Sequence, residues 1–366
     1  MTARPSTSKM NVQQNNALIL AALDERWENY RRQVKTCRQE FSEEAVHDLR
    51  VSTRRFLAIL DIARAIDPHP RIQKMRRFLK DQLDDLDDLR DVQVMLVEGS
   101  ETIENFLDLK SFEAHLEEQE KHLLRWARKQ INALKLSELK KRIEKISEAL
   151  KKRIVEESFS AQLFRTVDNA YLRTMQAYVQ VDASQPSTIH RLRLAFKKFR
   201  YMSEVIQPLI PDYPESHFEH MHQYQSTMGD IQDIETFLNA LTDFTESGAS
   251  SFDPRPIRSF YEKRHTELTA AFVEDKGELI AFWRAAPDQS FPWENNHDPI
   301  HHPSRHRRGG GNVRRRRQPA SADRQRSEED ALHRPGAEGV GKPTRPDPDQ
   351  SLPASHTDSG NSSKEV

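Results

Sequence analysis

The sequence predicts an all-α fold, and three observations support this prediction. Apolar residues recur with helical spacing from Asn16 onward. No stretch alternates apolar and polar residues between turn signals, as a half-buried strand would. Glycine is scarce before residue 294, where only four of the 11 glycines occur, at positions 99, 229, 248 and 277. We therefore expect long helices up to about residue 293.

The composition excludes several features, namely disulfides, cysteine-built metal sites and membrane spans. Of the 366 residues, 31% are charged, above the usual ~25%, as expected for long exposed helices, and the net charge is −1. Cys37 is the only cysteine, so neither an intrachain disulfide nor a cysteine-built metal site is expected. Residues 1–15 are polar, and no stretch approaches the ~18 apolar residues that a membrane span needs. We expect a soluble cytoplasmic protein with no membrane partner.

Two stretches, 46–56 and 189–199, share one pattern. In each, an arginine follows a histidine three residues later, and two basic residues follow the histidine at seven and eight. On a helix these steps place His, Arg and the first later cation on one face. The cations are His47, Arg50, Arg54 and Arg55 in the first copy, and His190, Arg193, Lys197, Lys198 and Arg200 in the second.

An apolar row runs beside each basic row, so each helix can bury one stripe. The rows are Val46, Leu49, Thr53, Phe56 and Leu60, and then Ile189, Leu192, Phe196, Phe199 and Ser203. Ser42 is a suitable cap for the first helix, which should end by Asp67 because Pro68 and Pro70 follow. The second helix follows Pro186, with Ser187 or Thr188 as its cap, and should stop before Pro208.

A second motif repeats after each basic helix. Residues 86–92 align with residues 228–234, with an offset one residue shorter than that of the basic helices. We expect helices at 71–97, ended by Gly99 and Ser100, at 101–133 and 136–157, and at 215–245. The pattern indicates a duplicated helical bundle, with repeats at about 16–157 and 158–290, whose halves face each other and bring the basic helices together.

The paired cation rows are typical of a receptor for a long polyanion. Arginine offers bidentate contacts to phosphate oxygens and lysine offers point charges. The alternative is that these cations pair with nearby acids, namely Asp48, Asp88, Asp91, Asp230 and Asp233. The Asp88/Asp91 and Asp230/Asp233 pairs could instead hold a metal ion with His47 and His190, although salt bridges are favoured. No motif for catalysis occurs, so we expect no enzymatic activity, no metal and no cofactor.

The two ends of the chain differ from the helical part. We expect residues 1–15 and 294–366 to be disordered, because apolar residues are too few to offset the entropy of ordering. The C-terminal tail contains His301, His302, three consecutive glycines and the arginine run 314–317. Such a tail is either solvated, a nucleic-acid-binding segment, or the product of a shifted reading frame.

These motifs resemble those of the CHAD domain family, the conserved histidine α-helical domain, over residues 16–290. The motifs that carry the resemblance are His47-Asp48-Leu49-Arg50 with Arg54-Arg55, His190-Arg191-Leu192-Arg193 with Lys197-Lys198-Phe199-Arg200-Tyr201, Leu89-Arg90-Asp91 and Asp230-Ile231-Gln232-Asp233. The resemblance implies two four-helix units related by pseudo-twofold symmetry. It also implies binding of inorganic polyphosphate and association with polyphosphate granules.

By the resemblance, the polyphosphate contacts are the nine cations of the two basic helices, with Arg77 and Lys80 as weaker candidates. Two departures predict weaker binding by the first half: Leu57 replaces the basic residue found at Arg200, and Asp87 replaces the glycine found at Gly229. Two other functions remain open. One is nucleic-acid binding through the same cations and the arginine-rich tail, and the other is metal-dependent phosphohydrolysis.

Overall fold

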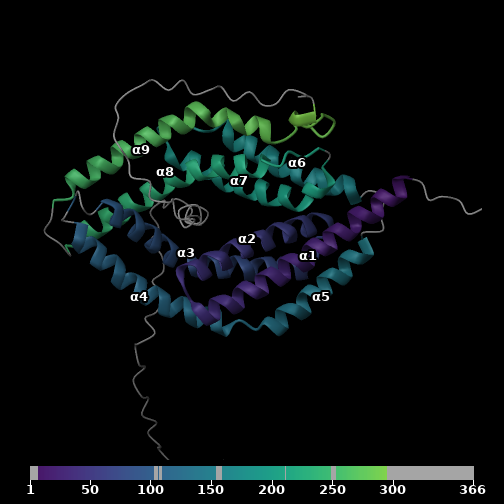
Figure 1. Cartoon of the computed structure of the whole chain (residues 1–366), viewed down its shortest axis with the longest axis horizontal. Helices are drawn as coiled ribbons and strands as arrows, with labels where there is room; N and C mark the ends of the chain where they lie inside the picture. Colours follow the sequence, from purple (N-terminus) through teal and green to yellow (C-terminus); the bar gives the residue numbers. More distant parts are fainter. Residues whose placement is uncertain are drawn as a thin grey trace, which may run out of the picture. The chain divides into compact units, whose positions relative to one another are not determined.

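The computed structural model describes residues 7–102, 106, 109–153, 159–210, 212–248 and 253–294. Within these ranges the secondary structure is helical and contains no strand, as the sequence predicts (Figure 1). The tail assigned to residues 294–366 lies outside the described residues except for Glu294. At the other end, we expected residues 1–15 to be disordered, but the first helix already begins at Thr7.

The described residues of the first half form five helices: α1 (Thr7–Glu40), α2 (Glu43–Ile66), α3 (Pro70–Thr102), α4 (Leu109–Ala133) and α5 (Leu136–Arg153). Neighbouring helices pack in chain order from α1 to α4, and α5 packs against α1 and α3. The rings of Trp27, Tyr30 and Phe56 join α1 to α2. This half has one helix more than the four that the resemblance implies.

In the second half, the residues that the structure describes form four α-helices: α6 (Phe159–Tyr178), α7 (Pro186–Ile206), α8 (His217–Glu246) and α9 (Arg255–Asp275). Short 3-10 helices follow α7 (η1, Gln207–Leu209) and α9 (η2, Lys276–Phe282), and a third ends the described chain (η3, Pro292–Glu294). Phe196 and Phe199 of α7 pack against Tyr224, Phe282 and Trp283. The chain after α9 therefore folds back onto the core of this half.

Local sequence signals explain where the basic helices begin and end. The Ser42 side chain accepts a hydrogen bond from the Ala45 N–H, confirming its predicted role as the cap of α2. Helix α2 ends at Ile66 and α7 at Ile206, before the prolines that disfavour continuation. The predicted cap of α7 was wrong, because Gln185 occupies that position and makes no side-chain cap.

Gly99 and Ser100 do not end the third helix, contrary to the prediction. Helix α3 continues to Thr102, whose hydroxyl lies 2.9 Å from the Tyr261 hydroxyl of α9. Glycine lowers helix propensity by about 1 kcal/mol. Tertiary contacts of this order are enough to carry a helix through one glycine, and the end of α3 packs against the second half.

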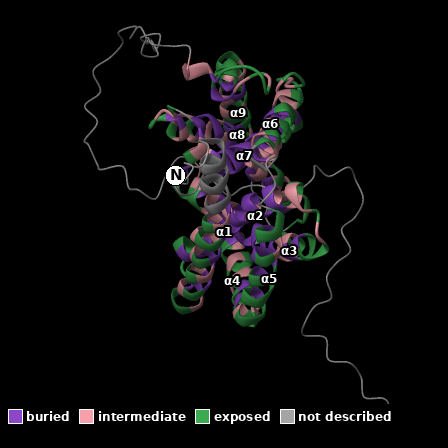
Figure 2. Ribbon diagram, turned by 90° about the vertical axis from the view of Figure 1, so that its right-hand side faces the viewer, coloured by how far each residue is buried: buried purple, intermediate pink, exposed green. Residues whose placement is uncertain are grey.

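The two halves meet through two separate groups of helices. Helix α2 packs against α6 and α7, and α3 packs against α8. Around the second contact lies an apolar cluster in which Phe112 of α4 meets Phe237 of α8 edge to face, at 5.5 Å between ring centroids. Buried residues are concentrated along α2 and α7 (Figure 2). The repeated basic motifs therefore lie in the interior, on the helices that join the halves.

Candidate polyanion-binding site

The basic rows predicted from the sequence are buried together with the apolar rows beside them. Arg50 and Arg193 have no exposed surface. The other four buried members are His47, Arg54, Lys197 and Arg200, each less than a tenth exposed. The reason is that α2 contacts α1, α3, α6 and α7, so more than one of its faces is covered. All ten residues of the two predicted apolar rows are buried as well.

Arg50 forms a buried ion pair inside the first half. Its Nη2 donates to Asp87 Oδ1 of α3 at 2.6 Å, and its Nη1 donates to the Leu83 carbonyl at 3.4 Å. The side chain of Asp87 is itself only 6% exposed. Asp87 was not among the acids that the sequence proposed as partners, although it belongs to the second repeated motif. Arg50 therefore attaches α3 to α2.

Two further ion pairs cross between the basic helices of the two halves. Arg55 of α2 lies 3.5 Å from Glu204 of α7, and Lys198 of α7 lies 2.9 Å from Asp61 of α2. As the number rises along α2 it falls along α7, so the helices are antiparallel at this contact. Lys198 follows Arg55 by 143 positions, Glu204 follows Asp61 by 143 positions, and the same offset separates the motif histidines.

This matched pair of salt bridges is the contact that a twofold relation between the repeats predicts. It also confirms the expectation that the two basic helices lie together. The Asp61 carboxylate also forms an ion pair with Arg76 of α3. This one carboxylate of α2 therefore connects α2 to both α3 and α7. The side chains of Arg55 and Lys198 remain 36% and 38% exposed, so they are more accessible than the six buried members of the rows.

His190 is held by a residue of the other repeated motif. Its Nδ1 contacts the Gln232 side-chain oxygen of α8, so in the neutral tautomer Nδ1 donates. Burial lowers the pKa of His190, and the nearby Arg193 lowers it further, while the bond to Gln232 opposes the shift. The imidazole is therefore neutral at pH 7 and offers hydrogen bonding rather than charge.

Arg90 belongs to the same group of buried cations, but the sequence did not single it out as a site residue. It is 1% exposed, and its Nη1 lies 2.7 Å from Glu43 Oε1 at the start of α2. Burial lowers the pKa of Arg90, whereas the negative charges of Glu43 and Asp233 oppose this shift. Its place inside the repeated Leu89-Arg90-Asp91 segment was the available signal.

The two weaker candidates are not buried. Arg77 and Lys80 are exposed on α3. Within the part of the chain that the structure describes, no three His, Cys, Asp or Glu side chains are grouped so that they could hold a metal ion. The described helices also include none long and apolar enough to cross a membrane.

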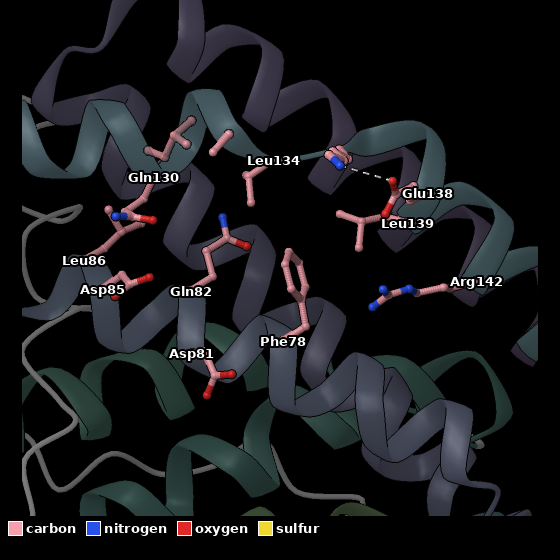
Figure 3. A pocket seen from close by; sticks show the side chains of 13 residues that line it. Phe78, Asp81, Gln82, Asp85, Leu86, Gln130, Leu134, Glu138, Leu139 and Arg142 are labelled. Atoms are coloured by element: carbon pink, nitrogen blue, oxygen red, sulfur yellow. Dashed lines mark ion pairs between the residues drawn. The ribbon is translucent and has the colours of Figure 1, made fainter. Parts of the chain in front are cut away.

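A cavity of about 330 Å³ lies elsewhere in the first half, between α3, α4 and α5. Figure 3 shows Phe78, Gln82, Leu134 and Leu139 around it, with Arg142 at one side. None of the eleven site residues predicted from the sequence lines this cavity. The buried cations and the cavity are therefore separate features.

Comparison with known proteins places this geometry in a family. The model of the CHAD domain matches residues 21–242. Among solved structures, the chain is similar to the crystal structure of the CHAD domain from the plant Ricinus communis, with 16% sequence identity and a TM-score of 0.52. That match covers 73% of this chain and 89% of the plant chain. A search of curated proteins finds no match.

Proposed function

The chain belongs to the CHAD domain family, and we propose that it binds inorganic polyphosphate through the paired basic helices α2 and α7, without catalysing a reaction. The observation that carries the proposal is the convergence of the two cation rows. Six members of these rows are buried, and they come from two helices that contact each other. Solvent and salt screen such charges less than exposed ones, so they act more strongly on a bound anion.

The surroundings of each cation divide the predicted residues by role. Arg50 is engaged by Asp87 and the Leu83 carbonyl, so in this proposal it holds the helices in register. Arg55 and Lys198 are partly exposed, and a phosphate oxygen can compete there with Glu204 and Asp61. His47, Arg54, Lys197 and Arg200, with His190, supply further hydrogen bonds and charge, and the fully buried Arg193 adds charge only. Arg77 and Lys80 extend the site only peripherally.

The test is a titration of the full chain with long-chain polyphosphate at about 150 mM salt, near physiological ionic strength. The variant Arg54→Met/Lys197→Met removes two charges from buried positions while keeping most of the side-chain volume. Because a hydrogen bond to a charged group contributes about 1.5–3 kcal/mol, we expect at least a hundredfold loss of affinity for the pair. Circular dichroism would confirm that the variant is folded.

Arg191→Gln provides the matched control, because Arg191 is exposed on the same helix as Lys197. It should bind polyphosphate as the unaltered chain does. Equal loss in the control, or no loss in the double variant, would contradict the proposal. Affinity should also fall steeply as salt is raised, because each neutralised phosphate releases counterions.

Single-stranded and duplex DNA serve as competing ligands in the same titration. Phe56 and Phe199 lie among the basic residues but are fully buried, so they offer no surface on which bases can stack. Polyphosphate should therefore outcompete DNA. Deletion of residues 294–366 should leave polyphosphate binding intact, whereas a nucleic-acid-binding protein that depends on the tail should lose its binding. We also propose a cytoplasmic location on polyphosphate granules, which imaging of a fluorescent fusion would test.

A further inference from the structure

Within the described residues, a large group of exposed positive charges lies away from the basic helices, on α4 and α5. Residues 121–153 contain twelve lysines and arginines but only three acids, whereas the whole chain is nearly neutral. All twelve cations are exposed. They are Lys121, Arg125, Arg128, Lys129, Lys135, Lys140, Lys141, Arg142, Lys145, Lys151, Lys152 and Arg153, called here the α4–α5 strip.

The folding of these helices explains why the cations face solvent. Leu139, Ile143, Ile146 and Leu150 are buried, and α5 packs against α1 and α3. Lys141, Lys145 and Lys152 lie on the opposite side at helical spacing. Helix α5 follows the end of α4 directly, as Figure 1 shows. Its 18 residues alone extend about 27 Å at 1.5 Å per residue, so the strip is elongated.

Local salt bridges do not neutralise the α4–α5 strip. Ion pairs among its described residues include Lys121–Glu118, Lys135–Glu138 and Lys140–Glu144, with separations of 3.5, 3.6 and 3.8 Å. All six side chains are more than half exposed, and exposed pairs of this kind contribute only about 0–1 kcal/mol. Three glutamates within residues 121–153 leave a local excess of nine positive charges.

The composition of the strip selects among polyanions. Among the described residues, the large hydrophobic side chains that are exposed are Val97, Leu172, Val179, Phe260 and Ile280, and none belongs to the strip. The exposed residues of the strip thus include no Phe, Tyr or Trp ring for base stacking and no apolar anchor for a lipid surface. Eight of its twelve cations are lysines. Their ammonium groups act as point charges and require no particular geometry of the bound anion. A flexible phosphate chain suits such a surface.

We propose that the α4–α5 strip is a second binding surface for long polyphosphate chains, separate from the α2–α7 site. The inference rests on the proposed function, because it assumes that the chain already binds polyphosphate at α2 and α7. A polymer held at the first site meets the strip at a high effective concentration, so even weak contacts add affinity. A short oligophosphate cannot span both surfaces and gains nothing from the strip.

The experiment compares long-chain polyphosphate with tripolyphosphate on the full chain. The strip variant is Lys141→Gln/Lys145→Gln/Lys152→Gln, and the matched control is Arg165→Gln/Arg173→Gln/Lys263→Gln, which removes three exposed cations from α6 and α9. The strip variant should bind long chains about tenfold more weakly, a loss of about 1.4 kcal/mol. Its affinity for tripolyphosphate should not change, and the control should match the unaltered chain with both ligands.

The outcomes separate this inference from the proposed function. Long-chain affinity that is unchanged in the strip variant, or equally reduced in the control, overturns the strip proposal and leaves the α2–α7 site intact. Absence of polyphosphate binding by the unaltered chain overturns both proposals. A duplex DNA titration completes the set, because binding of DNA alone that the strip variant loses would assign the surface to nucleic acid and refute the inference.

Discussion

Replacement of Asp87 by alanine removes a carboxylate that forms an ion pair with a fully buried arginine. Arg50 has no exposed surface, and Asp87 accepts its Nη2 at 2.6 Å. Loss of one partner of a buried pair leaves an uncompensated charge and destabilises a protein by about 3–5 kcal/mol. That is a large part of the ~5–15 kcal/mol by which domains are stable. We therefore expect Asp87→Ala to be strongly destabilising.

Urea unfolding of the full chain, followed by helical circular dichroism, measures this effect. With a denaturant slope of about 1–3 kcal/mol per molar urea, the midpoint should fall by roughly 1–5 M. Asp84→Ala is the matched control, one turn earlier on the same helix. Burial and the charge of Asp87 raise the pKa of Asp84, so removal of its carboxylate relieves repulsion and should not destabilise.

The double variant Arg50→Met/Asp87→Leu distinguishes lost charge compensation from lost packing. It removes both charges and keeps apolar volume, so it should recover most of the stability lost in Asp87→Ala. A midpoint for Asp87→Ala equal to that of Asp84→Ala would refute the reasoning. The buried charge of Arg50 would then not depend on Asp87 for compensation, and its burial would not require the ion pair with α3.

Two further predictions concern the second half and α3. Burial lowers the pKa of His217 to about 4, below its ordinary value near 6.5. The native state therefore binds fewer protons than the unfolded state, and His217 stabilises the fold fully above pH 6.5. This contribution should fall by about 1.4 kcal/mol per pH unit between 6.5 and 4, and urea midpoints measured across that range should depend less on pH in His217→Asn. For Gly99→Ala, the new Cβ would meet Phe237 at 3.9 Å, an ordinary contact. The gain in helix propensity of about 1 kcal/mol should raise the melting temperature by about 2–4 °C, whereas a decrease would show that Gly99 is needed for the packing of α3.

The fold class was readable from local patterns in the sequence. Apolar spacing predicted the helices, and Ser42 and the prolines after residues 66 and 206 marked the ends of the basic helices. These signals act within one or two turns, so they survive without knowledge of the tertiary structure. Gly99 shows the limit of local reasoning, because contacts of α3 with α8 and α9 outweigh its low helix propensity.

The candidate site could be predicted only in part from the sequence. The repeated His and Arg spacing identified the correct helices, and the interpretation as a duplicated bundle predicted that they would meet. The pattern did not reveal that six of the cations are buried, that Asp87 is the partner of Arg50, or that Arg90 joins them. The family resemblance marked Asp87 as a departure from a glycine, without indicating the ion pair it forms.

The sequence by itself determined the helices, the repeat and the membership of the basic residues in two matched rows. Only the tertiary structure decided which cations are enclosed and which remain exposed along α4 and α5. The physical reason is that periodicity defines a helix face from one chain segment, whereas burial depends on how many other segments cover that face. Helix α2 is covered by four helices. The basic residues that the sequence pattern placed on a charged face of this helix therefore lie in the interior.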